Sequence, residues 1–316
     1  MGDTKSRAKV SVALIGVGST WDLHYRAAIQ RLSAKISVRA VCDTVLCRAA
    51  SVADEFEAAP IDSPWLLTQR TDLHAWLILD PGWFCQYPAD LALRNERPAL
   101  FANTFSGSLV KTAALYQRSR EFGETLMPEF PQRFTPSTTR LRELMVTKLG
   151  RVQRIELVIP LRSGQTPADW LASSQSEAVG VFDWCSWLLG VPMGGISYHE
   201  SASGPQFELT FPARSPESQP LHATLRFSST EPTMTRVVEC ERGSATTSGP
   251  TQICWKAGAE EGVETFGQER SPYEIILDQF CRRALGGLVP VPTVQDALQA
   301  ITSTQLAIAC AKPRAD

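Results

Sequence analysis

The stretch VALIGVGSTWDLHYRAAI at residues 12–29 decides the fold of this chain. Its first four residues form a continuous apolar run, which is typical of a strand covered on both faces of a sheet. Gly16 and Gly18 follow, and after them Tyr25 and Ile29 repeat at the spacing of one helix face. The stretch therefore predicts a strand, a tight glycine turn and a helix.

An acidic residue at the end of the next predicted strand gives this turn a function. The strand at 37–42 leads directly into Asp43. In the dinucleotide-binding Rossmann fold, the glycines let backbone N–H groups approach the pyrophosphate and the helix N-terminus favours the anion. Asp43 is then expected to accept hydrogen bonds from the adenosine ribose, and its charge favours NAD over NADP. The residues predicted to bind the cofactor at the turn are Gly16, Gly18, Ser19 and Thr20.

Two residues near the turn bear on this interpretation. Trp21 stands where a third glycine normally allows the helix to pack closely on the strand, so a Rossmann-like fold without a nucleotide site is the alternative. Arg48 lies well into the next predicted helix, too far along the chain to reverse the preference for NAD.

The remaining patterns predict an α/β protein of two domains. Short apolar runs alternate with helical stretches as far as a helix at 109–122, which is typical of a parallel sheet. After Gly150, period-two alternation predicts strands with one wet face, as in a large and mostly antiparallel open sheet. We expect a Rossmann doubly wound parallel sheet at 1–125 and a C-terminal α/β domain at 126–316, whose last helix, at 294–311, packs back on the N-terminal domain or a sheet edge.

Composition limits the classes of partner. The formal net charge is -2, so there is no electrostatic case for nucleic acid or an anionic membrane surface. No run of about 20 apolar residues is present, so no membrane span is expected. The eight cysteines form no C-x-x-C pair, which argues against a metal site and favours free thiols in a reducing cytoplasm.

Six segments, in a characteristic order, resemble the Gfo/Idh/MocA family, the glucose-fructose oxidoreductase and inositol dehydrogenase group. The resemblance covers nearly the whole chain and implies a Rossmann domain, an open-sheet domain and pairing of subunits into a homo-oligomer through that sheet. The segments are residues 12–29, AVCD at 40–43, LILDP at 77–81, PQRFTPSTTRLREL at 131–144 with KLGRV at 148–152, DWCSWLLG at 183–190, and VPTVQDALQAI at 291–301.

The resemblance also shows where the catalytic positions differ. The family's Glu-Lys-Pro falls on 102–104, which puts Asn103 in the place of the lysine; an amide hydrogen-bonds but carries neither proton nor charge. The Trp-Leu-x-Gly segment at 187–190 places Asp183 on the aspartate of a His-x-x-Asp motif and Gly180 on its histidine. Cys85 falls near a histidine that follows a strand in the family.

From these positions we predict Asp183 and Asn103 as catalytic residues, Pro81 as a further cofactor contact, and Arg133 and Trp83 as substrate contacts. Each of three has a structural alternative: Asp183 capping or pairing in a core, Arg133 in an ion pair that joins domains, and Trp83 in core packing.

Three functions are compatible with this set. The first is an NAD-dependent oxidoreductase acting on a sugar, cyclitol or related polyol, with Asp183 and Tyr87 or a substrate group replacing the absent pair. The second is a catalytically degenerate nucleotide-binding sensor or regulator. The third is NAD-assisted glycoside cleavage or elimination.

Overall fold

The computed structural model describes residues 9–102, 109–123, 125–202, 204–217, 219–267 and 269–311. The chain divides into two compact units. The first comprises Met1–Glu129 with Tyr273–Leu298, and the second Phe130–Pro272 with Gln299–Asp316. The chain therefore returns to the first unit after completing most of the second.

The first unit is built on a six-stranded parallel sheet in the order β3-β2-β1-β4-β5-β6. This is the doubly wound order of a Rossmann fold, and it confirms the predicted class. The apolar run at 12–15 is fully buried in the central strand β1, as a strand covered on both faces should be. The strands are β1 (Val10–Ile15), β2 (Ile36–Cys42), β3 (Ala59–Ile61), β4 (Ala75–Ile78), β5 (Ala99–Phe101) and β6 (Leu126–Pro128).

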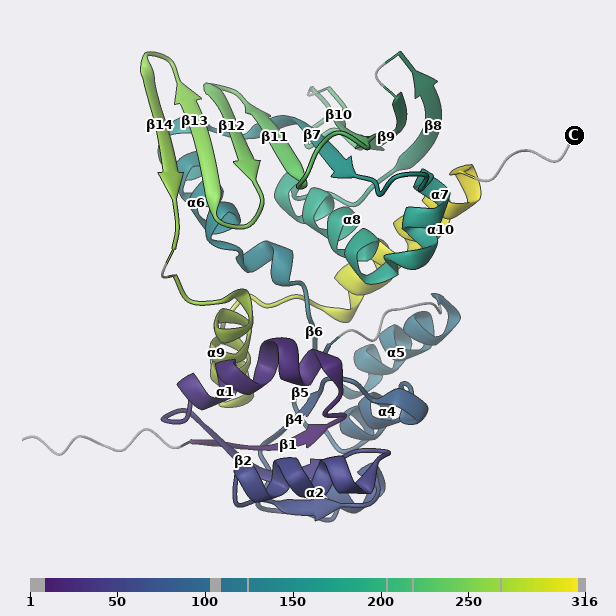
Figure 1. The fold of residues 1–316 in the computed structure, drawn as a ribbon, viewed down its shortest axis with the longest axis vertical. Coiled ribbons are helices and arrows are strands. Elements are labelled where there is room, and N and C mark those ends of the chain that lie inside the picture. The colour runs from purple at the N-terminus through teal and green to yellow at the C-terminus, as the bar shows by residue number, and fades with distance from the viewer. Residues whose placement is uncertain are drawn as a thin grey trace, which may run out of the picture. The chain divides into compact units, whose positions relative to one another are not determined.

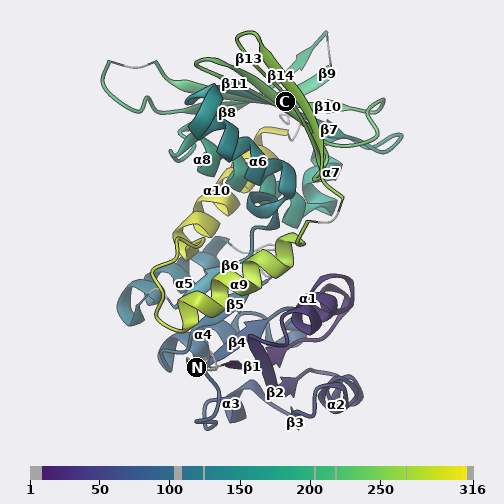
Figure 2. The same ribbon diagram turned by 90° about the vertical axis from the view of Figure 1, so that its left-hand side faces the viewer.

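The helices of this unit connect the strands, and one arrives from late in the chain. Helix α9 lies beside α1 in both views (Figures 1 and 2), and Arg31 donates a 2.6 Å hydrogen bond to Glu274 of α9. The helical segments are a π turn at Trp21–Tyr25, α1 (Arg26–Arg31), α2 (Leu46–Glu55), α3 (Pro64–Leu67), a 3-10 turn at Gly82–Phe84, α4 (Tyr87–Arg94), α5 (Leu109–Phe122) and α9 (Pro272–Ala284).

The second unit contains an eight-stranded sheet in the order β14-β13-β12-β11-β7-β10-β9-β8, with β14 and β8 as its edges. Only the β7–β10 pair is parallel, so the predicted mostly antiparallel sheet is confirmed. The strands are β7 (Val152–Pro160), β8 (Gly195–Ser201), β9 (Gly204–Phe211), β10 (Leu221–Ser228), β11 (Thr235–Cys240), β12 (Gly243–Ser248), β13 (Gln252–Ala257) and β14 (Glu260–Thr265).

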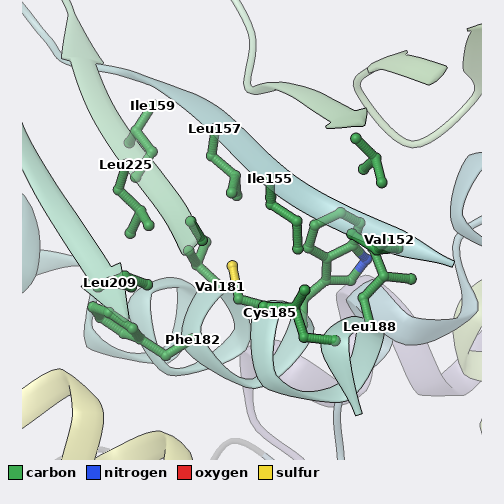
Figure 3. Close-up of a cluster of buried hydrophobic side chains, with 14 of the residues drawn as sticks. Val152, Ile155, Leu157, Ile159, Val181, Phe182, Cys185, Leu188, Leu209 and Leu225 are labelled. Atoms are coloured by element: carbon green, nitrogen blue, oxygen red, sulfur yellow. The ribbon is translucent and has the colours of Figure 1, made fainter. Parts of the chain in front are cut away.

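Helices cover one face of this sheet. Figure 2 shows α6 and α8 on the same side of it, and Figure 3 shows Ile155 and Leu157 of β7 facing Val181 and Cys185 of α8. These four residues are fully buried, so the apolar positions of the alternation predicted from sequence form the face of the sheet that packs on the helices. The helical segments are a 3-10 turn at Pro131–Phe134, α6 (Pro136–Leu144), a π turn at Met145–Leu149, α7 (Pro167–Ser173), α8 (Gln175–Leu189) and α10 (Val294–Ala311), which continues from the first unit.

The two strands β3 and β6 are the ones that the sequence did not reveal in the first unit. Each has three residues, and each contains a proline, Pro60 or Pro128. Proline lacks the N–H that a central strand must donate, so it is tolerated in a sheet mainly at an edge. Both strands occupy the edges of the sheet. Within the described residues, no helix combines the length and apolarity needed to cross a bilayer.

Candidate functional site

The glycine turn closes on the loop that follows β4. Gly16 has a φ of 79°, and a Cβ atom added to it would overlap the backbone carbonyl of Asp80 and lie 2.8 Å from the Cα of that residue. Only glycine permits both the left-handed conformation and this close approach. Strands β1 and β4 flank the point where the strand order reverses, and ligands bind there in open α/β sheets. The turn therefore stands at the expected place for a dinucleotide.

Trp21 is a core residue of this unit. Its side chain is 1% exposed and packs edge-on against Phe56, with ring centroids 5.7 Å apart. The first helical turn is widened into a π turn, in which the N–H of Arg26 bonds to the carbonyl of Trp21. Because a bulky indole replaces the third glycine, we attribute the wider turn to the room that this ring needs.

Asp43 holds the glycine turn in place. Its carboxylate is 2% exposed and accepts hydrogen bonds from the N–H of Val17 at 2.8 Å, the N–H of Val45 at 2.7 Å and the guanidinium of Arg48 at 2.7 Å. Both oxygens are thus occupied within the protein. Arg48, which we had judged too far along the chain, is brought onto Asp43 by the first turn of α2. A carboxylate can accept about four hydrogen bonds, so a ribose hydroxyl would have to use the one remaining position on Oδ2 or replace one of these three partners.

Because of the contacts of Asp43, the stability of the first unit is expected to fall at acidic pH. Burial alone would raise the pKa of Asp43, but hydrogen bonds from Arg48 and from the N–H groups of Val17 and Val45 outweigh it and lower the pKa. The pKa of an unfolded Asp is about 3.9. The stabilisation from the Asp43 contacts is therefore fully present above that pH and is lost as the pH falls through the folded pKa. We expect Asp43→Asn to be less stable than the wild type at about pH 7 in urea unfolding, and the gap to narrow at about pH 3. An equal gap at both pH values would contradict this assignment.

Asp80 brings a second carboxylate to the turn; it lies in the LILDP segment, but sequence reasoning assigned it no role. The Cγ of Asp80 lies 3.2 Å from the position that a Cβ atom of Gly18 would take. The negatively charged carboxylate of Asp80 therefore faces the side of Gly18 that carries no side chain. Arg48 lies within electrostatic range of Asp80 as well as of Asp43.

The other predicted residues of the first unit have different exposures. Ser19 is exposed at the start of the helix, whereas Thr20 is buried. Pro81 is buried and precedes the 3-10 turn, in which Trp83 is 94% exposed, so Trp83 is not a core residue of the unit. Asn103 lies outside the described residues.

In the second unit, Arg133 and Asp183 form a buried ion pair. The guanidinium donates to both carboxylate oxygens, at 2.7 and 2.5 Å, and the side chains are 7% and 2% exposed. The guanidinium also lies over the rings of Phe130 and Trp187. The pair connects the 3-10 turn at Pro131–Phe134 to α8 within one unit. It is therefore a core ion pair, the structural alternative that we considered for Asp183.

Gln132 stands beside the glycine that replaces the expected histidine. A Cβ atom on Gly180 would lie 3.0 Å from the side-chain nitrogen of Gln132, and the Gln132 oxygen accepts a 2.7 Å hydrogen bond from Arg236 of β11. Sequence reasoning missed both residues. The sequence did contain a signal for Arg236. It alternates with Val238 and Cys240 on the buried face of β11, where a charged residue is unusual.

Comparison with known proteins gives the fold a family context. No family model and no curated protein sequence matches the chain. Solved structures do match over nearly all of it. An oxidoreductase from Sinorhizobium meliloti aligns with a TM-score of 0.78 at 12% identity, covering 96% of this chain and 98% of that one. A Gfo/Idh/MocA family oxidoreductase from Vibrio cholerae aligns with a TM-score of 0.73 at 15% identity, covering 96% and 97%.

A third structure has a stated sugar-nucleotide activity. UDP-N-acetylglucosamine 3-dehydrogenase from Acidithiobacillus ferrooxidans aligns with a TM-score of 0.73 at 16% identity, covering 96% of this chain and 98% of that one. The chain therefore has the fold of the Gfo/Idh/MocA oxidoreductases, as the sequence segments predicted.

Proposed function

We propose that this chain is a nicotinamide-dinucleotide-dependent oxidoreductase that acts on a sugar, cyclitol or related polyol. The observation that supports it most is the glycine turn, which is closed on the Asp80 backbone at the switch point of a doubly wound sheet. The sugar-nucleotide dehydrogenase among the structures of the same fold agrees with this class of substrate.

The residues of the turn fit a dinucleotide in part. The backbone from Gly16 to Thr20 would hold the pyrophosphate, as the first turn of a helix after a glycine loop does. The nicotinamide would supply the hydride acceptor or donor. At the ribose end, Arg48 covers Asp43 and is itself 47% exposed, so a guanidinium rather than a free carboxylate faces the ligand. The argument for NAD over NADP that rests on a free Asp43 is weakened accordingly.

In this proposal the protein orients the substrate more than it moves protons. Asp183 is paired through both oxygens with Arg133, and Gly180 offers no side chain, so we assign the Arg133–Asp183 pair a positioning role. Asn103 would orient a substrate hydroxyl by hydrogen bonding. The exposed ring of Trp83 would supply an apolar face to a sugar. We further propose that two copies associate through the uncovered face of the eight-stranded sheet.

A second candidate is a catalytically degenerate nucleotide-binding sensor. It is favoured by the same ion pair, because neither of the two inherited proton-transfer positions in α8 carries a free titratable group. Loss of general acid–base catalysis costs about 10²–10⁴ in rate, enough to abolish useful turnover.

One titration series separates the two candidates. NADH and NADPH are titrated by fluorescence, and absorbance at the nicotinamide band is then followed with a panel of sugars and inositols. We expect binding by the wild type and at least about tenfold weaker binding by Gly16→Ala, because its Cβ would displace the Asp80 loop. Gly123→Ala is the matched control: its φ is 91°, but no atom lies within 4 Å of the added Cβ.

Each outcome has a distinct meaning. Turnover of any polyol supports the oxidoreductase, and binding without turnover supports the sensor. If neither nucleotide binds the wild type, both candidates are wrong. If Gly123→Ala weakens binding as much as Gly16→Ala, the glycine turn is not the binding site.

A further inference from the structure

Arg236 is a buried cation without a carboxylate partner in the described part of the chain. Its side chain is 5% exposed on the inward face of β11, with the guanidinium 5.0 Å from the ring of Trp184. One nitrogen donates to Gln132, but Nε has no partner. Burial lowers the pKa of Arg236 to about 10, which leaves it charged at neutral pH. An uncompensated charge in a core is costly, so its retention calls for an explanation.

The contrast with Arg133 sharpens the observation. Both arginines are buried in the same unit, but Arg133 has Asp183 on two of its nitrogens, whereas Arg236 has a neutral amide on one. The sequence suggested Arg133 as the residue for an anionic substrate group. Its charge is already balanced within the protein, and that of Arg236 is not.

A second unused hydrogen-bonding group lies next to Arg236. Thr247 of β12 pairs directly with Arg236 across the sheet, so the two side chains share a face. The Thr247 hydroxyl is buried and has no partner. Gln132 adds an amide N–H beside Gly180, and its side chain fills the position that a side chain of residue 180 would take, 3.0 Å from an added Cβ. Gln132 is the partly exposed member of the cluster, whereas Arg236 and Thr247 are buried, so a ligand would reach them by displacing the Gln132 side chain.

The charges around the cluster favour a singly charged ligand. Arg236 is its only described cation, and Glu177, which is exposed, contributes a negative field at Arg236. The neighbouring thiol of Cys185 stays protonated, since burial raises its pKa to about 12. One guanidinium balances one carboxylate and matches its planar geometry, whereas a phosphate dianion would remain half compensated.

We propose that Arg236, Gln132 and Thr247 form a binding site for the carboxylate of an anionic sugar, such as a uronate or aldonate. This inference rests on the proposed function, because it specifies the substrate class of the polyol site. It predicts that a sugar acid binds where the family's histidine is absent.

The test is a binding experiment without nucleotide, so that it stands apart from the redox assay. The wild type is titrated with D-glucuronate, D-glucose and D-glucose 6-phosphate by calorimetry, with tryptophan fluorescence as a second signal because Trp184 contacts Arg236. We expect glucuronate to bind at least about tenfold more tightly than glucose, as one charge-assisted hydrogen bond would give. Equal affinities, or tighter binding of the phosphate ester, would overturn the proposal.

Variants locate the site. Arg236→Gln should abolish the preference for glucuronate, whereas Arg142→Gln should retain it; Arg142 also stacks on a tryptophan of this unit, 4.8 Å from the ring of Trp187, but is exposed. Thr247→Val is the second variant, which tests the site even if Arg236→Gln does not fold. It preserves the shape of the side chain, removes a hydroxyl that has no partner in the protein, and should weaken glucuronate binding by about fivefold. Unchanged binding in Thr247→Val and Arg236→Gln would refute the site. Glucuronate binding in a protein that binds no nucleotide would support this site while refuting the redox proposal.

Discussion

Replacing Asp80 by asparagine is expected to tighten NADH binding by about tenfold, which corresponds to about 1.4 kcal/mol. The Asp80 carboxylate faces the open side of Gly18, where a pyrophosphate would approach the turn. Two unit charges 4 Å apart interact by about 1 kcal/mol in water and about 4 kcal/mol at an effective dielectric constant of 20. Asparagine keeps the size of the side chain and removes this repulsion. The measurement is the fluorescence titration of NADH with the wild type and the variant.

Asp72→Asn provides the matched control for Asp80→Asn. It changes the net charge equally, but Asp72 is an exposed partner of Arg70 that precedes β4, at the opposite end of that strand. Its NADH affinity should match the wild type. The gain in Asp80→Asn should also shrink at high salt, because Asp80 is partly exposed to screening ions. Weaker binding by Asp80→Asn would show instead that Asp80 is a ligand of the nucleotide.

Truncation of Asp183 is expected to destabilise the second unit by about 3–5 kcal/mol, the usual consequence of leaving a buried charge unpaired. In Asp183→Ala the guanidinium of Arg133, which is 7% exposed, loses both of its carboxylate contacts. The double variant Arg133→Met, Asp183→Leu removes both charges, and it should recover most of the loss. Urea unfolding followed by tryptophan fluorescence measures the free energies.

An exposed carboxylate of the same unit serves as the reference for Asp183→Ala. Glu143 is 58% exposed and pairs with Arg140, so Glu143→Ala should cost less than about 1 kcal/mol. If Asp183→Ala unfolds like the wild type but loses turnover, Asp183 is a catalytic base and the positioning role is wrong. A stability loss with turnover partly restored in the double variant supports the positioning role.

The fold could be predicted because its signals are local. The apolar run of β1, the glycine turn and the period-two strands each depend on residues close in sequence, and helix α5 has the predicted bounds Leu109–Phe122. The segments that escaped prediction are those whose structure depends on their place in a sheet. Strands β3 and β6 are too short and too rich in proline to show a period of their own.

The site was less predictable because its contacts join distant residues. Arg133 and Asp183 are 50 residues apart, and Gln132 and Arg236 are 104 apart. A motif shows that Asp183 is present but not that Arg133 occupies both of its oxygens. Likewise, the carboxylate of Asp80 meets Gly18 only because two loops converge at the switch point. Sequence reasoning found the glycine turn and the altered catalytic positions, and tertiary packing decided what surrounds them.

The edge strand β14 limits how this protein can grow into larger assemblies. Three of its six residues, Glu260, Glu261 and Glu264, are acidic. A strand donated by another molecule would have to align its backbone along this acidic border, which charged side chains on edge strands discourage. Runaway strand addition and fibre formation are therefore disfavoured at this end of the sheet. An association of two copies face to face through the sheet would leave this acidic edge unpaired and, as a symmetric pair, would be closed and finite.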